Sequence, residues 1–353
     1  CASTATRPAP RDPVPCAGRG VAATLPDFLE DFVTILVTGA AGFIGSHLTD
    51  SLLAAGHQVV GLDNFDSFYP RRMKEANLER ARGYRSFELI EGDIRDRSLL
   101  DGLPEVSAIF HLAAVAGVRP SIHDPGRYAD VNATGTALLL DLARERGVKT
   151  FVFASSSSVY GNSPDVPFRE TAAADQPISP YAATKRAAEL LTHAATHLNG
   201  TTTLCLRLFT VFGPRQRPDL AIRKFVELLS RGEPIPMFGD GTTARDYTFV
   251  SDTVDGLMRG YEWAQDHPGR HEVVNLGRGT AVSLQDMIQI VADELGVEAR
   301  IERMPSQPGD ARRTMADIRK ARELLGYEPE VEFREGVRRM ADWLDPARGA
   351  SRS

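Results

Sequence analysis

Tyr181 and Lys185 are the residues whose types and spacing point most directly to chemistry. They stand four positions apart in a run that reads as a helix, Pro180 to Leu190, so both side chains lie on one face. A tyrosine with an ordinary pKa of about 10 is a poor base at neutral pH, but a nearby ammonium favours the phenolate. The pair could therefore take a proton from a hydroxyl group, although the same spacing also arises by chance.

A run of four serines, Ser155 to Ser158, follows the apolar strand predicted over Thr150 to Ala154. Serine is common in turns, so a polar turn is one explanation of the run. The other is that a serine hydroxyl donates a hydrogen bond to a reacting substrate oxygen. The tyrosine and lysine pair favours this second explanation.

The elements that must position these groups begin with a glycine-rich turn. The apolar run from Val33 to Thr38 is followed by Gly39, Gly42 and Gly45, and then by helical periodicity. Gly39 can adopt the angles of a tight turn, Gly42 lets a diphosphate approach the main chain, and Gly45 lets the helix lie close to the strand. Because a helix N-terminus favours phosphate groups, this context predicts nucleotide binding over a merely structural turn.

An acidic residue should follow such a turn by about 20 positions, at the end of the next strand. Asp63 stands there, after the strand predicted from His57 to Leu62. Its carboxylate can accept hydrogen bonds from both ribose hydroxyls of NAD and repels the 2′-phosphate of NADP, so we predict NAD. The alternative is that Asp63 only opens the next loop as a turn residue.

Two further strands are expected to end at the same edge of the sheet. Asp93 ends the strand predicted from Ser86, where it either contacts the adenine amino group or serves as a turn acid. The strand from Ala108 to Ala114 ends in small residues, which leave room for a cofactor. Arg119 follows at the mouth of the expected cleft.

The composition is that of an ordinary soluble globular chain, with 353 residues of which 42% are hydrophobic and 25% charged. A formal net charge of −6 gives no general attraction to nucleic acid. The odd set of three cysteines implies no disulfide framework and fits a reducing cytoplasm, where we expect the protein to act. No apolar stretch reaches the length of a membrane span, and we expect neither a membrane partner nor a metal site.

Strands and helices alternate from Val33, which predicts an α/β fold with a doubly wound parallel (Rossmann) sheet. From about Leu220 the elements become shorter and mixed, which predicts a smaller C-terminal α/β substrate domain. The expected division is a disordered leader (1–30), a mainly NAD-binding domain with the tyrosine and lysine pair (31–215), a mainly substrate-binding domain (216–345) and a frayed tail (346–353).

Four features together carry a resemblance to a known family, through their order along the chain and their separations. They are the glycine turn, the two strand-end acids, the serine run with Tyr160-Gly161, and Tyr181-x-x-x-Lys185. The chain resembles an extended short-chain dehydrogenase/reductase, specifically a nucleotide-sugar epimerase, from about Val33 to Trp343. The segment from Thr210 to Asp219 is closer to UDP-glucuronate 4-epimerases than to UDP-glucose 4-epimerases, in which an asparagine typically replaces the threonine.

The resemblance implies three groups of site residues. The catalytic residues are Tyr181, Lys185 and Ser156. The residues implied for NAD are Tyr181, Lys185, Gly39, Gly42, Phe43, Ile44, Gly45, Asp63, Asn64, Asp93, Ile94, Leu112, Ala113 and Ala114. The residues implied for a UDP-sugar are Gly117, Val118, Arg119, Ser156, Ser157, Ser158, Thr210, Arg217, Arg245, Tyr247 and Asp310.

Two of the substrate residues have open alternatives. Arg245 matches the family arginine that binds diphosphate, but it could be a surface arginine. Asp310 matches an acid near the uridine ribose, and the family arginine three residues before it is Gln307 here. Arg312 or Arg313 would then substitute for that arginine.

The implied activity is NAD-dependent 4-epimerisation of UDP-glucuronate to UDP-galacturonate through a 4-keto sugar, by a homodimer. Thr210 and Arg217 would hold the sugar carboxylate, unless they are a strand-end residue and a solvated loop charge. Dehydratases carry an Asp-Glu pair where Ser157 and Ser158 stand, and UDP-glucuronate decarboxylases carry a Glu at the second of these positions. The alternatives are therefore a UDP-glucose 4-epimerase, a decarboxylase, a dehydratase, or a protein that binds NAD and UDP-sugar without turnover.

Overall fold

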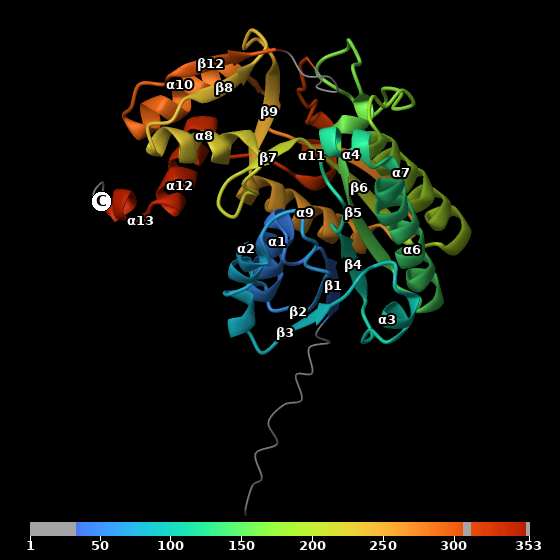
Figure 1. The fold of residues 1–353 in the computed structure, drawn as a ribbon. Coiled ribbons are helices and arrows are strands. Elements are labelled where there is room, and N and C mark those ends of the chain that lie inside the picture. The colour runs from blue at the N-terminus through green and yellow to red at the C-terminus, as the bar shows by residue number, and fades with distance from the viewer. Residues whose placement is uncertain (1–32, 306–311, 351–353) are drawn as a thin grey trace, which may run out of the picture. The chain divides into compact units, whose positions relative to one another are not determined.

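The computed structural model describes residues 33–305 and 312–350, so the expected leader and Asp310 lie outside the described residues. Its main sheet has seven parallel strands, β1 (Thr34–Thr38), β2 (Gln58–Asp63), β3 (Phe87–Glu91), β4 (Ala108–His111), β5 (Thr150–Ser156), β6 (Thr202–Leu208) and β10 (His271–Leu276). Their order in the sheet is β10-β6-β5-β4-β1-β2-β3 (Figure 1). β2 and β3 follow on one side of β1, and β4, β5 and β6 follow on the other, so the direction of strand addition reverses at β1. The doubly wound α/β fold predicted from the sequence is confirmed.

Helices cover both faces of this sheet (Figure 1). Those on one face are α1 (Phe43–Ala54) and α9 (Val250–Asp266), and those on the other are α6 (Gly135–Glu145) and α7 (Pro180–Asn199). Successive residues of β1 point to alternate faces, because Ile35 and Val37 belong to one buried cluster and Leu36 to the other. Both clusters need apolar residues, so the strand is apolar throughout.

The second half of the chain builds two small sheets. One contains β7 (Thr210–Phe212), β9 (Ala244–Phe249) and β11 (Ala281–Ser283), and the other β8 (Ile235–Phe238) and β12 (Ile301–Met304). The helices beside them are α8 (Ala221–Ser230), α10 (Leu284–Leu295) and α12 (Phe333–Leu344). The chain also returns to the main sheet, since β10 pairs with β6, so the two predicted domains share one sheet.

The remaining helices are α2 (Arg71–Asn77), α3 (Arg97–Asp101), α4 (Val118–His123), α5 (Pro125–Tyr128), α11 (Arg319–Leu325) and α13 (Pro346–Ala350). A π-helix over Ala129–Thr134 leads into α6. Within the tail expected to fray, residues 346–350 form α13. The Arg348 guanidinium donates there to the main-chain carbonyls of Glu294 and Leu295 at the end of α10, which ties this short helix down.

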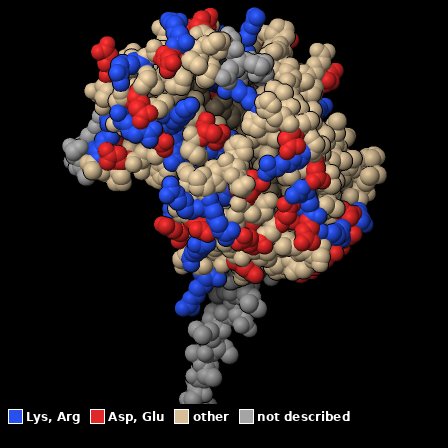
Figure 2. Space-filling model, in the orientation of Figure 1, with Lys and Arg blue, Asp and Glu red and all other residues tan. Residues whose placement is uncertain are grey.

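Acidic and basic side chains are interspersed on the face shown in Figure 2, in keeping with the modest net charge. In the described parts of the chain, no helix is long and apolar enough to cross a bilayer.

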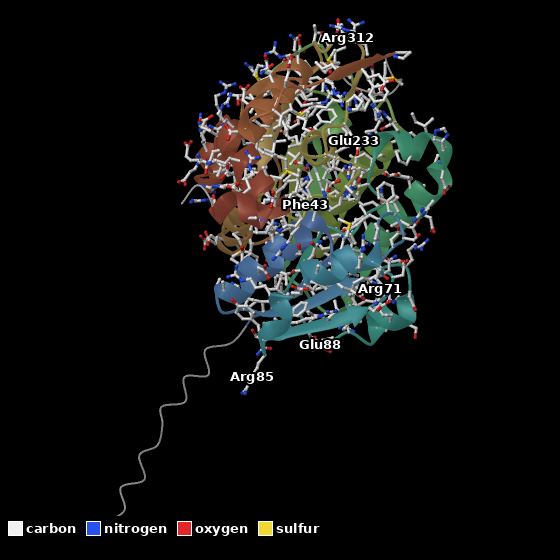
Figure 3. All side chains as sticks on the ribbon, turned by 60° about the vertical axis from the view of Figure 1, so that its left-hand side comes forward. Phe43, Arg71, Arg85, Glu88, Glu233 and Arg312 are labelled. Atoms are coloured by element: carbon white, nitrogen blue, oxygen red, sulfur yellow. The ribbon has the colours of Figure 1, made fainter. Side chains whose placement is uncertain are left out.

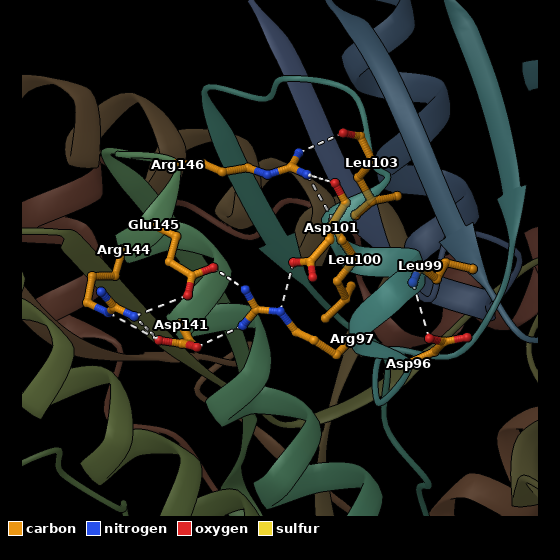
Figure 4. Close-up of polar contacts among 10 residues, drawn as sticks. All are labelled: Asp96, Arg97, Leu99, Leu100, Asp101, Leu103, Asp141, Arg144, Glu145 and Arg146. Atoms are coloured by element: carbon orange, nitrogen blue, oxygen red, sulfur yellow. Dashed lines mark hydrogen bonds and ion pairs between the residues drawn. The ribbon is translucent and has the colours of Figure 1, made fainter.

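Arg146 closes the short helix α3 from the neighbouring end of α6 (Figure 4). Its Nη1 donates to the carbonyls of Leu103 and Pro104, and its Nη2 to those of Leu100 and Asp101. The carbonyls of Asp101, Leu103 and Pro104 lie at or beyond the last residue of α3, where the helix supplies no further N–H donor, and a cation at a helix C-terminus also interacts favourably with the helix dipole.

Replacing Arg146 with alanine should lower the free energy of unfolding by about 1–3 kcal/mol, because partly buried carbonyls lose their donors. Urea denaturation of the two proteins measures this difference. Arg144→Ala is the matched control, since exposed Arg144 pairs with Asp141 and Glu145 at the surface and its loss should cost less than about 0.5 kcal/mol. Equal losses in the two variants would contradict this account of Arg146.

Candidate active site

A cleft of about 620 Å³ opens at the carboxyl edge of the main sheet, where most of the predicted site residues meet. From the glycine turn and β2 to β4 it is lined by Gly39, Gly42, Phe43, Ile44, Gly45, Asp63, Asn64, Asp93, Ile94, Leu112, Ala113, Ala114, Gly117 and Val118. From β5, α7 and the second half of the chain it is lined by Ser156, Ser157, Ser158, Tyr181, Lys185, Thr210, Arg217 and Arg245.

A second cavity of about 1260 Å³ lies between the small sheets and α8 and contains the predicted residues Arg119 and Tyr247. It shares Thr210, Leu220 and Arg245 with the first cleft, so the two adjoin. Basic side chains line it together with aromatic rings, and one of them, Arg312, lies far from Phe43 in the view of Figure 3. A ligand with two anionic or aromatic parts fits this pair of cavities.

The glycine turn makes room for a diphosphate because no side chain fits there. Gly39 has a φ of 74°, and a Cβ on it would lie 2.8 Å from the amide nitrogen of Ala113. A Cβ on Gly45 would lie 2.1 Å from the carbonyl oxygen of Gly39, so α1 packs directly on the turn. The residues present therefore fit a dinucleotide, with the N-terminal end of α1 facing the cleft.

Asp63 is fixed at the end of β2 by the backbone. Its carboxylate accepts hydrogen bonds from the amides of Ala41 (3.0 Å) and Phe65 (2.8 Å), and the Lys74 ammonium lies 3.8 Å away. Burial raises the pKa of Asp63, while Lys74 and the two amides lower it. Each carboxylate oxygen has two lone pairs, so these contacts leave acceptor capacity toward the cleft.

Asp93 and Asn64 lie side by side where β2 and β3 end, since the Asn64 amide donates to Asp93 at 3.0 Å. Arg95 donates to both oxygens of Asp93 and also pairs with Asp130. Hydrogen bonds from Arg95 hold the pKa of Asp93 well below its usual range. The carboxylate therefore stays charged at neutral pH.

Tyr181 lies at the start of α7, facing the end of β5. Burial raises the pKa of Tyr181, and a hydrogen bond with Ser156 and the charge of Arg217 oppose this rise. Ser156 also accepts a hydrogen bond from the Ser158 amide at 3.1 Å, which orients its hydroxyl oxygen. The two predicted reacting groups, phenol and serine hydroxyl, are thus adjacent.

Lys185 is buried one turn further along α7. Its ammonium donates to the carbonyl of Ala154 at 2.8 Å and lies over the Phe153 ring. Burial lowers the pKa of Lys185 to about 8, and the Glu189 carboxylate one turn later raises it. The ammonium is therefore charged at neutral pH, as the predicted pairing with Tyr181 requires.

Arg217 lines the same cleft, close enough for its charge to lower the pKa of Tyr181. Its Nε and Nη2 donate to Asp219 at 3.0 and 2.8 Å, and its guanidinium lies 4.9 Å from the centre of the Phe68 ring. Asp219 takes two of the five N–H donors of the guanidinium. The structure thus brings Thr210, Arg217 and the serine run to one cleft, with Arg217 paired to a neighbour in the sequence.

Sequence reasoning missed several residues that shape the cleft. Glu189 is buried and accepts hydrogen bonds from Ser155 (2.6 Å) and from two nitrogens of buried Arg207 (both 2.8 Å). Asn132, in the π-helix, donates to Thr184 next to Lys185. A glutamate one turn after Lys185 on the same helix face was the available signal for Glu189, whereas nothing local marks its partner Arg207.

The doubly wound sheet, the glycine turn and the tyrosine and lysine pair define an extended short-chain dehydrogenase/reductase. The chain belongs to the GDP-mannose 4,6 dehydratase family, whose model it matches over residues 36–340.

Known relatives narrow this class. The chain is 41% identical over 313 residues to a UDP-glucuronate 4-epimerase of Thermodesulfobacterium geofontis, which covers 87% of this chain and 95% of that one. It is also similar to the crystal structure of UDP-glucuronic acid 4-epimerase from Bacillus cereus in complex with UDP-glucuronic acid and NAD. The TM-score is 0.84 and the identity 35%, and the match covers 89% of this chain and 100% of that chain. The structure of a UDP-glucose 4-epimerase from Thermotoga maritima with UDP-glucose matches this chain with a TM-score of 0.81 and 32% identity. This match covers 89% of this chain and 99% of that chain.

Replacing Asp63 with alanine should weaken NAD binding by about tenfold or more, because hydrogen bonds to a charged acceptor are lost. It should also reduce discrimination against NADP, since the repulsive charge is gone. Calorimetric titration with each dinucleotide measures both effects. Glu91→Ala, at the end of β3 but outside the cleft, should change neither affinity. Preference of the unmodified protein for NADP would contradict this reading of Asp63.

Proposed function

We propose that this protein is an NAD-dependent 4-epimerase that converts UDP-glucuronate to UDP-galacturonate. The observation that carries the proposal is the convergence of Tyr181, Ser156 and Arg217 on one cleft at the mouth of a dinucleotide cradle. The relatives described above, named for this activity, support the same substrate.

In this proposal residues 31–215 mainly bind NAD and residues 216–345 mainly bind the UDP-sugar. The glycine turn faces the cofactor diphosphate, and Asp63 accepts the adenosine ribose hydroxyls. The second cavity takes the uridine diphosphate, where Arg245 matches phosphate oxygens with its fork of donors. The sugar then extends through the shared wall at Thr210 toward Tyr181.

The proposed reaction begins with Tyr181 as the base. Lys185 helps to stabilise the phenolate, which takes the proton of the C4 hydroxyl as that carbon is oxidised. Ser156 holds the same oxygen by a hydrogen bond. NAD, which the glycine turn and Asp63 would hold, would supply the acceptor for the C4 hydride and its return. Between oxidation and reduction the 4-keto sugar turns over, so that the hydride returns to the opposite face of C4 and Tyr181 returns the proton to the C4 oxygen.

A uronic acid adds a hazard, because its 4-keto form is a β-keto acid that loses carbon dioxide easily. Loss requires the bond to the carboxyl carbon to stand roughly perpendicular to the ketone plane, where it overlaps the carbonyl π system. Thr210 and Arg217 would hold the carboxylate near that plane by hydrogen bonds. Arg217 can bind it while keeping Asp219, since the guanidinium retains further donors.

The rival reactions need a carboxylate that the described cleft does not place beside Ser156. Elimination of water from C5 and C6 requires an acid and a base near C5, and the next two residues are Ser157 and Ser158. A UDP-glucose 4-epimerase is the second candidate, supported by the similarity to the Thermotoga maritima structure. A non-catalytic binding protein would have no use for the ordered phenol, hydroxyl and ammonium.

We further propose that the chain acts in the cytoplasm as a homodimer. Leu190 and Leu198 on α7 are 55% and 76% exposed, and α7 packs beside α6, so this helix pair offers an apolar surface to a second copy. Sedimentation of the purified chain at twice the monomer mass supports the dimer, and sedimentation as a monomer contradicts it.

Tyr181→Phe should lower kcat for UDP-glucuronate epimerisation by about 100-fold or more while NAD stays bound, because the general base is lost but the ring still packs. Chromatographic separation of UDP-glucuronate from UDP-galacturonate measures the rate, and absorbance of the released cofactor measures NAD. Tyr84→Phe, on the loop before β3, is the control that should keep full activity. Near-normal turnover by Tyr181→Phe would overturn the mechanism.

Arg217→His and Thr210→Ala should each lower epimerisation of UDP-glucuronate and raise the UDP-pentose byproduct, by about tenfold in their ratio, because the carboxylate rotates more freely. NAD binding should stay unchanged. Arg231→Ala, an exposed arginine at the end of α8, should leave the ratio as it is. Unchanged turnover and unchanged byproduct in both variants would move the substrate toward a neutral UDP-hexose.

A further inference from the structure

The loop that carries Arg217 is fastened to the helix that faces the cofactor. This loop, residues 213–217, leaves β7 and runs beside α1. The His47 ring donates from Nε2 to the carbonyl of Pro214 at 2.9 Å, and Arg215 Nη2 donates to Asp50 Oδ2 at 2.8 Å. Phe43, His47 and Asp50 are spaced so that they share one face of α1.

Both contacts are largely removed from water. The side chains of Asp50 and Arg215 are 9% and 17% exposed, and breaking one partner of such a pair leaves the other charge poorly solvated. Burial lowers the pKa of His47 to about 4, so the ring is neutral at physiological pH and acts as a hydrogen-bond donor. Titration of His47 therefore does not interrupt its contact with Pro214 near neutral pH.

The loop needs this fastening because its backbone is in an unfavourable conformation. Arg215 has a φ of 64°, a left-handed conformation that costs energy for a residue with a Cβ. Gln216 is buried next to it, donating to the carbonyl of Val211 at 3.0 Å and accepting a hydrogen bond at its main-chain carbonyl from Arg223. The next residue is Arg217, whose direction is thus set by residues before it that bind α1.

We propose that Asp50 and Arg215 are positioning residues that act through Arg217 to suppress decarboxylation of the 4-keto intermediate. The inference rests on the proposed function. The ion pair holds the loop against α1, so that the Arg217 guanidinium keeps the sugar carboxylate near the ketone plane. The same helix that faces the cofactor diphosphate therefore also determines the fate of the intermediate.

Two products report on this role. Return of the hydride to C4 gives UDP-galacturonate. Alternatively the bond between C5 and the carboxyl carbon breaks, its electron pair forms an enolate with the C4 ketone, carbon dioxide leaves, and C5 takes a proton to give a UDP-4-keto-pentose. Both products come from one intermediate, so a general loss of folded protein lowers both in parallel and leaves their ratio unchanged.

The test measures the ratio of decarboxylated product to UDP-galacturonate in Asp50→Asn and Arg215→Gly. Glycine adopts a φ of 64° without strain, so Arg215→Gly removes the ion pair while the loop can keep the same backbone conformation. Both variants should raise the ratio by about tenfold with NAD still bound. A displaced Arg217 would hold the sugar carboxylate less well, so that more of the intermediate is decarboxylated and less is reduced to UDP-galacturonate. Asp252→Asn, a buried aspartate on α9 that accepts a hydrogen bond from Val331, is the matched control and should keep the wild-type ratio.

An unchanged ratio in both NAD-bound variants, with epimerisation intact in the wild type, would overturn the positioning role alone. If Asp50→Asn fails to fold, Arg215→Gly decides the question by itself. Failure of the wild type to form UDP-galacturonate would overturn the proposed function and this inference with it.

Discussion

The close approach of α1 to the turn after β1 is the constraint on which the rest of the structure depends. Gly45 lies where any Cβ would meet the Gly39 carbonyl oxygen at 2.1 Å, so the helix can only reach this position with glycine there. The approach creates the space for a diphosphate and presents the helix N-terminus to it. It also brings Asp50 to Arg215, so that the loop of residues 213–217 is held against the same helix.

A buried charge network fixes the other wall of the cleft. Glu189 accepts hydrogen bonds from Ser155 on β5, Arg207 on β6 and Arg186 on α7, which ties the three elements together. Although burial raises it, the pKa of Glu189 is lowered overall by these donors, so the carboxylate is charged. An ionised group in the interior persists only when it is paired, and the pairing here holds α7, which carries Tyr181, against β5 and β6.

The sequence predicts what depends on local spacing. The glycine turn and Asp63 could be found because the first lies before a helix and the second ends the strand after that helix. Their separation along the chain is therefore nearly fixed in this kind of fold. The partners Lys74, Arg207 and Asp50 could not, since they meet Asp63, Glu189 and Arg215 only through the fold. The π-helix before α6 and the helix at residues 346–350 were missed for a similar reason, as tertiary contacts override weak local preferences.

In the proposed reaction, hydride leaves C4 and returns to the other face of the same carbon within one site. UDP-glucuronate carrying deuterium at C4 tests it most directly. Incubated with the purified protein in ordinary water, this substrate should give UDP-galacturonate that retains deuterium at C4, as observed by mass spectrometry and NMR. Replacement of the deuterium by solvent hydrogen, or inversion without its transfer, would contradict the account.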